Sequence, residues 1–169
     1  MRKEGGGQGT NWVLCDDCSH WVHFDCDSFL RTLQEPNDQV SDEKMYWCPQ
    51  CRTKLRRKVL KHVLEELKMF DEYQFYYEPT YEEIIGYRET IKQPMCLFAM
   101  AEKIIAGSYD EAPYHGLVSD LELITSNAMT FNMPKDEVYY RAKVLLVIGK
   151  RYLEVMRPII ECSEQFLLD

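Results

Sequence analysis

Residues 126–134, with the sequence SNAMTFNMP, decide the fold class of this chain. Upstream of them Leu117, Leu121, Ile124 and Ala128 recur at spacings of four, three and four. This spacing places the four side chains on one face of an amphipathic helix. The segment 133–136 (MPKD) then interrupts the pattern before a second helical pattern begins. The stretch therefore predicts two helices joined by a short polar loop.

Asn132 follows the first of these helices directly. A side-chain amide at that position can satisfy carbonyl groups left unpaired at the helix end, or it can offer a paired donor and acceptor to a pocket. An isolated Asn is more often a cap. The neighbouring sequence shifts the balance towards the pocket.

Three segments, in the same order along the chain, resemble the bromodomain family, the four-helix bundles that bind acetyl-lysine. Residues 127–132 (NAMTFN) resemble the end of helix B and the loop after it, and residues 87–97 (YRETIKQPMCL) resemble the family's Tyr-Tyr-x-x-Ile-x-x-Pro-Met-Asp-Leu segment. Residues 103–109 (KIIAGSY) match the end of helix A. The resemblance implies a mainly α chain, with a left-handed four-helix bundle over residues 54–165.

The resemblance also implies the residues of an acetyl-lysine pocket. Asn132 would donate its side-chain N–H to the acetyl oxygen, and Tyr87 would hold a water that bridges to the same oxygen. Val138 and Phe131 would line the mouth of the pocket. Such a pocket rejects unmodified lysine, because an ammonium group is costly to desolvate without a counter-ion.

The aromatic-rich loop 71–94 would supply the remaining wall of that pocket. By resemblance, Tyr76 takes the usual position of a shelf Phe and Thr80 takes the second position of the usual Pro-Val pair. Ile84 or Ile85 is the alternative source of the apolar wall. A loop of this length without periodicity indicates a functional loop, although several of its rings are expected to serve packing alone.

Composition and charge exclude several classes of protein. The chain has 169 residues, of which 46% are hydrophobic and 28% charged, so it can bury a core and is not a disordered polymer. Its net charge of −8 disfavours DNA phosphates as a main partner and suits a basic partner such as a histone tail. Neither a bilayer-spanning apolar run nor a signal peptide is recognisable. We therefore expect an intracellular protein with no membrane association and with DNA contact weak or absent.

Five of the seven cysteines lie within the first 51 residues, which indicates a second, smaller domain. Their spacing is Cys-x2-Cys-x4-His-x2-Cys-x21-Cys-x2-Cys, formed by Cys15, Cys18, His23, Cys26, Cys48 and Cys51. Paired Cys-x2-Cys knuckles in a reducing compartment predict a closed structural Zn²⁺ site. Disulfides are the alternative, disfavoured by the odd number of cysteines.

This spacing resembles the last six metal ligands of a PHD finger. The resemblance implies that Cys15, Cys18, Cys48 and Cys51 form one complete zinc site, and that His23 and Cys26 are half of a second site. The opening pair of ligands is absent, so either the chain begins inside the finger or a degraded finger keeps a single zinc. We expect a flexible segment over residues 1–10 and a partial finger over residues 11–53. The basic join 52–58 lacks Pro and Gly, so it should run directly into the first helix of the bundle.

Two tryptophans of the finger have two open interpretations. Trp12 and Trp21 stand at positions where related fingers build an aromatic cage for methylated lysine, held by cation–π attraction. The alternative, which we favour, is that Trp21 packs the small core and Trp12 is an exposed remnant. On the first interpretation, a methylated histone tail is a partner of the finger.

Together these patterns predict a non-catalytic, nuclear chromatin reader that binds acetylated histone tails, monomeric as this chain. Fingers joined to such bundles are similar to parts of trithorax-type methyltransferases and transcriptional corepressors, so any enzyme activity would belong to a larger protein. The alternative is a zinc-dependent scaffold, RING-like or histone-independent, whose bundle does not read acetyl-lysine. A zinc hydrolase is disfavoured, because a site saturated by thiolates leaves no position for water.

Overall fold

The computed structural model describes residues 3–6, 10–32, 45–71, 75–77 and 84–161. It divides into two compact units, of which the first ends at Arg56 and the second spans Arg57–Glu161. Thr80 lies outside the described residues. The expected domain boundaries, 11–53 and 54–165, stay predictions.

The first unit contains a small antiparallel sheet. Its strands are β1 (Lys3–Gly6), β2 (Thr10–Leu14) and β3 (Trp21–His23), in the order β1-β2-β3. A 3-10 turn, η1 (Phe24–Cys26), and the short helix α1 (Ser28–Thr32) follow. Strand β1 lies within the segment that the sequence suggested to be flexible. Its pairing with β2 uses main-chain groups, which glycine supplies as well as any other residue.

The first unit contains a buried ion pair. Arg52 Nη2 donates to both carboxylate oxygens of Asp27, at 2.7 and 2.9 Å, and the Tyr46 hydroxyl donates to Asp27 Oδ2 at 2.7 Å. Asp27 is 1% exposed and Arg52 is 5% exposed. Burial alone would raise the pKa of Asp27, but the hydrogen bonds from Arg52 and Tyr46 outweigh it and lower that pKa. The carboxylate is therefore held in its charged form in the interior.

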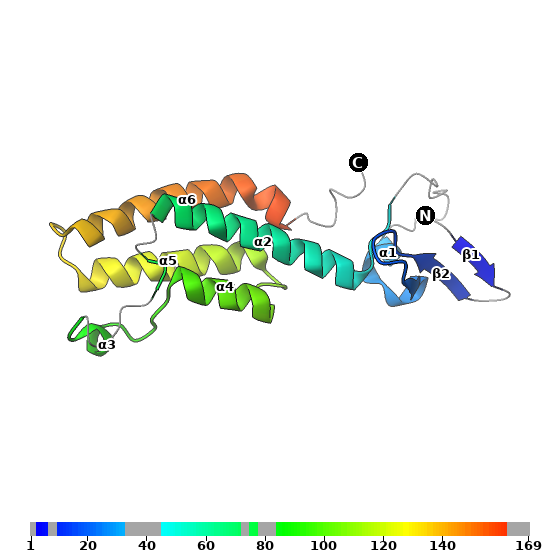
Figure 1. Ribbon diagram of the computed structural model, residues 1–169, viewed down its shortest axis with the longest axis horizontal. Helices are drawn as coiled ribbons and strands as arrows, with labels where there is room; N and C mark the ends of the chain where they lie inside the picture. The colour runs from blue at the N-terminus through cyan, green and yellow to red at the C-terminus, as the bar shows by residue number, and fades with distance from the viewer. Residues whose placement is uncertain (1–2, 7–9, 33–44, 72–74, 78–83, 162–169) are drawn as a thin grey trace. The chain divides into compact units, whose positions relative to one another are not determined.

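The second unit is the four-helix bundle that the sequence predicts (Figure 1). Its helices are α2 (Pro49–Asp71), α4 (Leu97–Ala106), α5 (Pro113–Phe131) and α6 (Glu137–Glu161), and the single-turn helix α3 (Tyr87–Thr90) lies between α2 and α4. Helix α2 runs through the basic join without a break, as expected. All four long helices contribute to one core, whose fully buried members include Leu60, Leu64, Leu97, Met100, Leu117, Leu121, Leu153 and Ile160.

The turn after α4 depends on glycine. Gly107 ends the helix in the left-handed region, with φ of 82°, where residues with a Cβ are strained. The Arg57 guanidinium donates to Asp110 Oδ2 at 2.8 Å close beside this turn. A Cβ added to Gly107 would lie 2.5 Å from Arg57 Nη2, so both conformation and space favour glycine.

Candidate functional site

A cavity opens at the end of the bundle where α5 ends and α6 begins. Its volume is about 170 Å³, comparable with the roughly 150 Å³ apolar cavities that admit a benzene-sized molecule. Among the residues that the structure describes, ten line the cavity and none of them carries a formal charge, so this lining suits a neutral, largely apolar group. The lining residues are Phe75, Tyr77, Ile84, Tyr87, Met95, Ile124, Ala128, Phe131, Asn132 and Val138.

Asn132 both caps α5 and lines the cavity. Its backbone N–H donates to the Ala128 carbonyl at 3.0 Å, and its side-chain Nδ2 donates to the same oxygen at 2.8 Å. An amide nitrogen carries two protons, so the cap uses one N–H and leaves the second for a ligand. The two interpretations of Asn132 are therefore compatible, because the cap fixes the orientation of the amide.

Tyr87 is a second residue of the cavity wall with a polar side-chain group. Its ring lies edge-on to Phe131, with centroids 5.2 Å apart at an angle of 68°, and the residue is 7% exposed. The loop beyond it is tied to α5, since Asn127 Nδ2 donates to the Gln93 carbonyl at 2.8 Å. These contacts hold the Tyr87 ring against the cavity.

The main chain of Phe75 forms hydrogen bonds that fix the loop segment 75–77 to both α2 and α4. The Asp71 carboxylate accepts from the Phe75 N–H at 2.6 Å, and the Leu97 N–H donates to the Phe75 carbonyl at 3.0 Å. Phe75 and Tyr77 both line the cavity, whereas the residue between them, Tyr76, does not. The Tyr76 ring instead packs beneath Lys68, whose Nζ lies 4.7 Å from the ring centroid.

Five of the residues expected in the pocket line the cavity: Asn132, Tyr87, Phe131, Val138 and Ile84. Tyr76 and Ile85 do not. Residues 75–77 form a tight turn, which brings Phe75 and Tyr77 to the cavity and the Tyr76 ring to Lys68. Ile85 is 94% exposed, and Ile84 supplies the wall instead.

Sequence reasoning missed five other lining residues: Phe75, Tyr77, Met95, Ile124 and Ala128. Ile124 and Ala128 carried a signal, because they belong to the helical stripe that the sequence assigned to the core. Met95 stands inside the recognised 87–97 segment. The two loop aromatics carried no periodic signal that could separate them from Tyr76.

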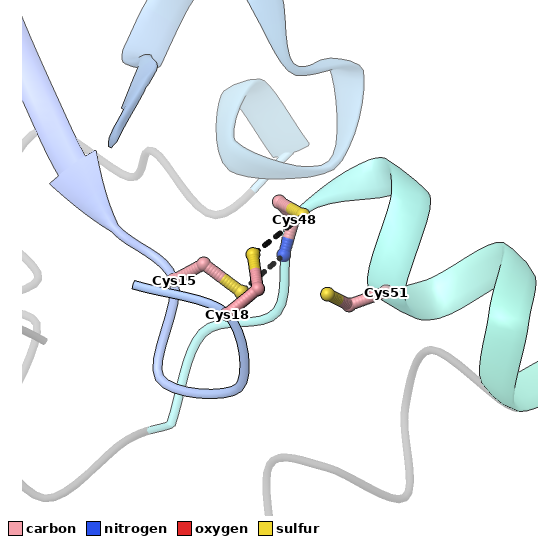
Figure 2. Close-up of side chains that lie close together, drawn as sticks. All are labelled: Cys15, Cys18, Cys48 and Cys51. Atoms are coloured by element: carbon pink, nitrogen blue, oxygen red, sulfur yellow. Dashed lines mark hydrogen bonds between the residues drawn. The ribbon is translucent and has the colours of Figure 1, made fainter. Parts of the chain in front are cut away.

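The first unit brings four cysteines together. The sulfurs of Cys15, Cys18, Cys48 and Cys51 all lie within 4.8 Å of one another, and those of Cys18 and Cys48 are 3.7 Å apart (Figure 2). Tetrahedral coordination with Zn–S bonds of about 2.3 Å requires S···S separations of about 3.8 Å. The geometry fits a structural zinc ion, which we assign as the cofactor of this unit.

The thiol electrostatics agree with a cation at this centre. Burial opposes ionisation of Cys15, but backbone hydrogen bonds from Cys18, Cys48 and Asp17 outweigh it and lower the pKa of Cys15 to about 7. Burial, together with interactions with Asp17 and the neighbouring thiols, raises the pKa of Cys51. Four thiols this close cannot all ionise without a positive charge among them, and a metal ion supplies that charge.

The two residues of the expected half site lie close together, and their role as ligands stays a prediction. Cys26 Sγ lies 3.8 Å from His23 Nδ1, so two potential ligands face one another. Within the part of the chain that the structure describes, the four cysteines above are the one group of three or more potential metal ligands.

The two tryptophans of the finger share one face of its sheet. Trp12 pairs with His23 and Leu14 pairs with Trp21 across strands β2 and β3. Paired residues, and residues two apart on one strand, point to the same side of a sheet. Trp12 is 41% exposed and Trp21 is 36% exposed, so both rings are accessible on this face.

The chain is similar to known chromatin proteins. A model of the bromodomain family matches residues 60–144, about half of the chain, and a model of the PHD finger matches residues 3–51. Among the described residues, none of the helices has the length and apolar character needed to cross a bilayer.

Individual relatives match across one or both units. Bromodomain-containing protein 9 of Homo sapiens is 37% identical over 106 residues, covering 62% of this chain and 17% of the relative. Nucleosome-remodeling factor subunit NURF301 of Drosophila melanogaster is 27% identical over 144 residues, covering 77% of this chain and 5% of the relative. A NURF301-like protein of Caenorhabditis elegans is 24% identical and covers 93% of this chain and 8% of the relative. The chain thus spans less than a fifth of these relatives.

Proposed function

The chain belongs to the bromodomain family, with a PHD finger ahead of its helical bundle, and we propose that it reads acetyl-lysine on histone tails through the cavity at the end of α5. Both domain types are non-catalytic reader modules of chromatin-associated proteins.

One observation carries the acetyl-lysine proposal: a cavity whose described lining residues are all uncharged contains an asparagine whose amide is already oriented. The cap on Ala128 leaves one Asn132 N–H to donate to the acetyl oxygen. Tyr87 would support the same oxygen through a water, which costs little when the water has good partners. Ile84, Phe131 and Val138 offer apolar surface to the lysine stem and the acetyl methyl group.

The same cavity discriminates against unmodified lysine. An ammonium group entering it would lose its hydration without meeting a carboxylate of the described lining, because none of those lining residues is acidic. Burying an unpaired charge costs several kcal/mol even after relaxation, far more than one lost hydrogen bond. Acetylation removes that cost, so the ligand is recognised by its loss of charge.

A histone peptide array tests this proposal. The chain should bind acetylated spots above their unmodified counterparts, and Asn132→Ala should lose that preference. Tyr87→Phe serves as a milder variant, because it keeps the ring and removes the hydroxyl. Equal binding of acetylated and unmodified spots would favour the alternative, a zinc-dependent scaffold that does not read acetyl-lysine.

A second candidate function belongs to the finger. The shared face of Trp12 and Trp21 favours binding of methylated lysine, since cations are attracted to exposed indole faces. A trimethyl-lysine peptide should then bind more tightly than the unmodified peptide, and Trp21→Ala should remove the difference. If the two peptides bind equally, the tryptophans serve packing alone, as the sequence favours.

The relatives extend the proposal beyond the chain. Since chromatin proteins share both modules, we propose a nuclear location, with any enzymatic activity carried by other parts of a larger protein. We also expect the isolated chain to be monomeric, which sedimentation equilibrium can measure. A nuclear-exclusion pattern of the tagged full-length protein would contradict the first of these expectations.

A further inference from the structure

Two exposed aromatic rings form a pair at the edge of the cavity. Tyr77 is 68% exposed and Phe98 is 40% exposed, and their ring centroids are 5.7 Å apart with planes tilted by 36°. Tyr77 also lines the cavity, so this pair starts at the cavity wall and continues onto the surface. We call Tyr77 and Phe98 the aromatic ledge.

The aromatic ledge is held in place before any ligand binds. The Phe98 N–H donates to the Tyr76 carbonyl at 2.9 Å, which joins the loop to the first turn of α4. The Tyr76 ring contacts both ledge rings, with centroids 4.4 Å from Tyr77 and 6.0 Å from Phe98. Because these rings are already ordered, a ligand that stacks on them loses little of their conformational entropy.

A carboxylate lies one helical turn from the ledge. Glu102 follows Phe98 by four residues on α4, so the two share a helix face with Cβ atoms about 5–6 Å apart. Side chains on a helix lean towards its N-terminus, which directs Glu102 towards Phe98. Glu102 is exposed and, within the described part of the chain, has no ion-pair partner. Two ring faces and an unpaired carboxylate together suit a cationic, planar group.

We propose that the aromatic ledge and Glu102 bind an arginine side chain of the same peptide whose acetyl-lysine enters the cavity. Arginine stacks on aromatic rings more readily than lysine does, and its guanidinium can also pair with a carboxylate. The net charge of −8 favours a basic peptide. Tyr77 belongs both to the cavity wall and to the ledge, so the two binding sites adjoin one another. Because an extended peptide advances about 3.3 Å per residue, we expect the arginine within about three positions of the acetyl-lysine. This inference rests on the proposed acetyl-lysine function.

A peptide series measures the contribution of the ledge. Each peptide carries one acetyl-lysine in a neutral background and one arginine at a position from three before to three after it. Its matched control carries citrulline at that position, which keeps the planar shape and removes the charge. At one or two positions, the arginine peptide should bind about two- to fivefold more tightly than its control, the range expected of an exposed cation–π contact.

Three variants separate the ledge from the cavity. Phe98→Leu should abolish the arginine advantage and leave the affinity for the citrulline peptide unchanged. Glu102→Gln should reduce the advantage and its dependence on salt. Glu111→Gln removes an exposed charge beyond the opposite end of α4 and should change neither.

Each outcome decides the inference. The inference is overturned if no position distinguishes arginine from citrulline, or if Phe98→Leu weakens both peptides equally. Binding of the citrulline peptides reports the acetyl-lysine function alone, so the ledge can fail while that function stands. If no acetylated peptide binds, the function and the ledge fail together.

Discussion

Removal of the buried guanidinium of Arg52 should weaken zinc binding strongly, although Arg52 is not a ligand. In Arg52→Met, the Asp27 carboxylate keeps its bonds from Tyr46 and the Phe29 N–H but loses both bonds from the guanidinium, at 2.7 and 2.9 Å. Removing one partner of a buried ion pair typically lowers the free energy of unfolding by about 3–5 kcal/mol. Asp27 is 1% exposed and Arg52 is 5% exposed, so the cost of a buried ion pair applies here.

The loss should appear in the zinc affinity, because small metal-stabilised domains couple folding to metal binding. At about 1.4 kcal/mol per tenfold, a cost of about 3–5 kcal/mol should raise the apparent zinc dissociation constant by about 100-fold to 4,000-fold. Competition with a chromophoric chelator measures this constant directly. Lys54→Met, an exposed change on the same helix, should leave it unaltered.

The double variant Asp27→Asn with Arg52→Met sharpens the test. A neutral amide in place of the carboxylate needs no counter-ion, so the double variant should recover part of the affinity that Arg52→Met loses. If Arg52→Met bound zinc like the unaltered chain, the buried ion pair would contribute nothing to the finger, and the reasoning would be refuted.

Metal analysis should find about one zinc per chain, because the finger has one complete set of four cysteines and a second set with only two ligands. A result of no zinc, or of two equivalents, would contradict this. Asn132→Ala should cost about 1–3 kcal/mol in acetyl-peptide binding and about 0.5–1.5 kcal/mol in unfolding free energy, because the amide serves both ligand and cap. Calorimetric titration and chemical denaturation separate the two losses. Normal acetyl-peptide binding by the Asn132→Ala variant would contradict the assignment of the pocket. Gly107→Ala should lower the unfolding free energy by about 1–2 kcal/mol from left-handed strain, with a further loss from contact with Arg57. Gly86→Ala, at φ of 83° with open space around it, isolates the strain, so equal losses would exclude the contact.

The sequence predicts the bundle well because helical periodicity and ligand spacing are local signals. The stripe that ends at Ala128 is buried along α5, and the polar residue that follows it, Asn132, lines the cavity. The Cys-x2-Cys knuckles predicted the four-cysteine centre for the same reason, since each pair is set by a single turn.

Features that depend on contacts between distant residues were not predictable. The orientation of loop 75–77 is set by Asp71 and by main-chain groups of α4, and no property of the loop sequence distinguishes Tyr76 from its neighbours. The ion pair of Asp27 and Arg52 joins residues 25 positions apart. Strand β1 forms through backbone pairing, to which its glycines gave no clue.

The central claim is tested most directly by titrating one histone peptide, acetylated and unmodified, at low and moderate salt. Attraction between the −8 chain and a basic tail is screened beyond about 10 Å at 0.1 M salt, whereas a hydrogen bond and apolar contacts inside a cavity are not. If the cavity dominates, the acetylated peptide should change its affinity by less than about tenfold, the unmodified peptide remaining much weaker throughout. Equal binding of the two peptides, with affinity collapsing as salt rises, would show an acidic docking surface and contradict acetyl-lysine recognition.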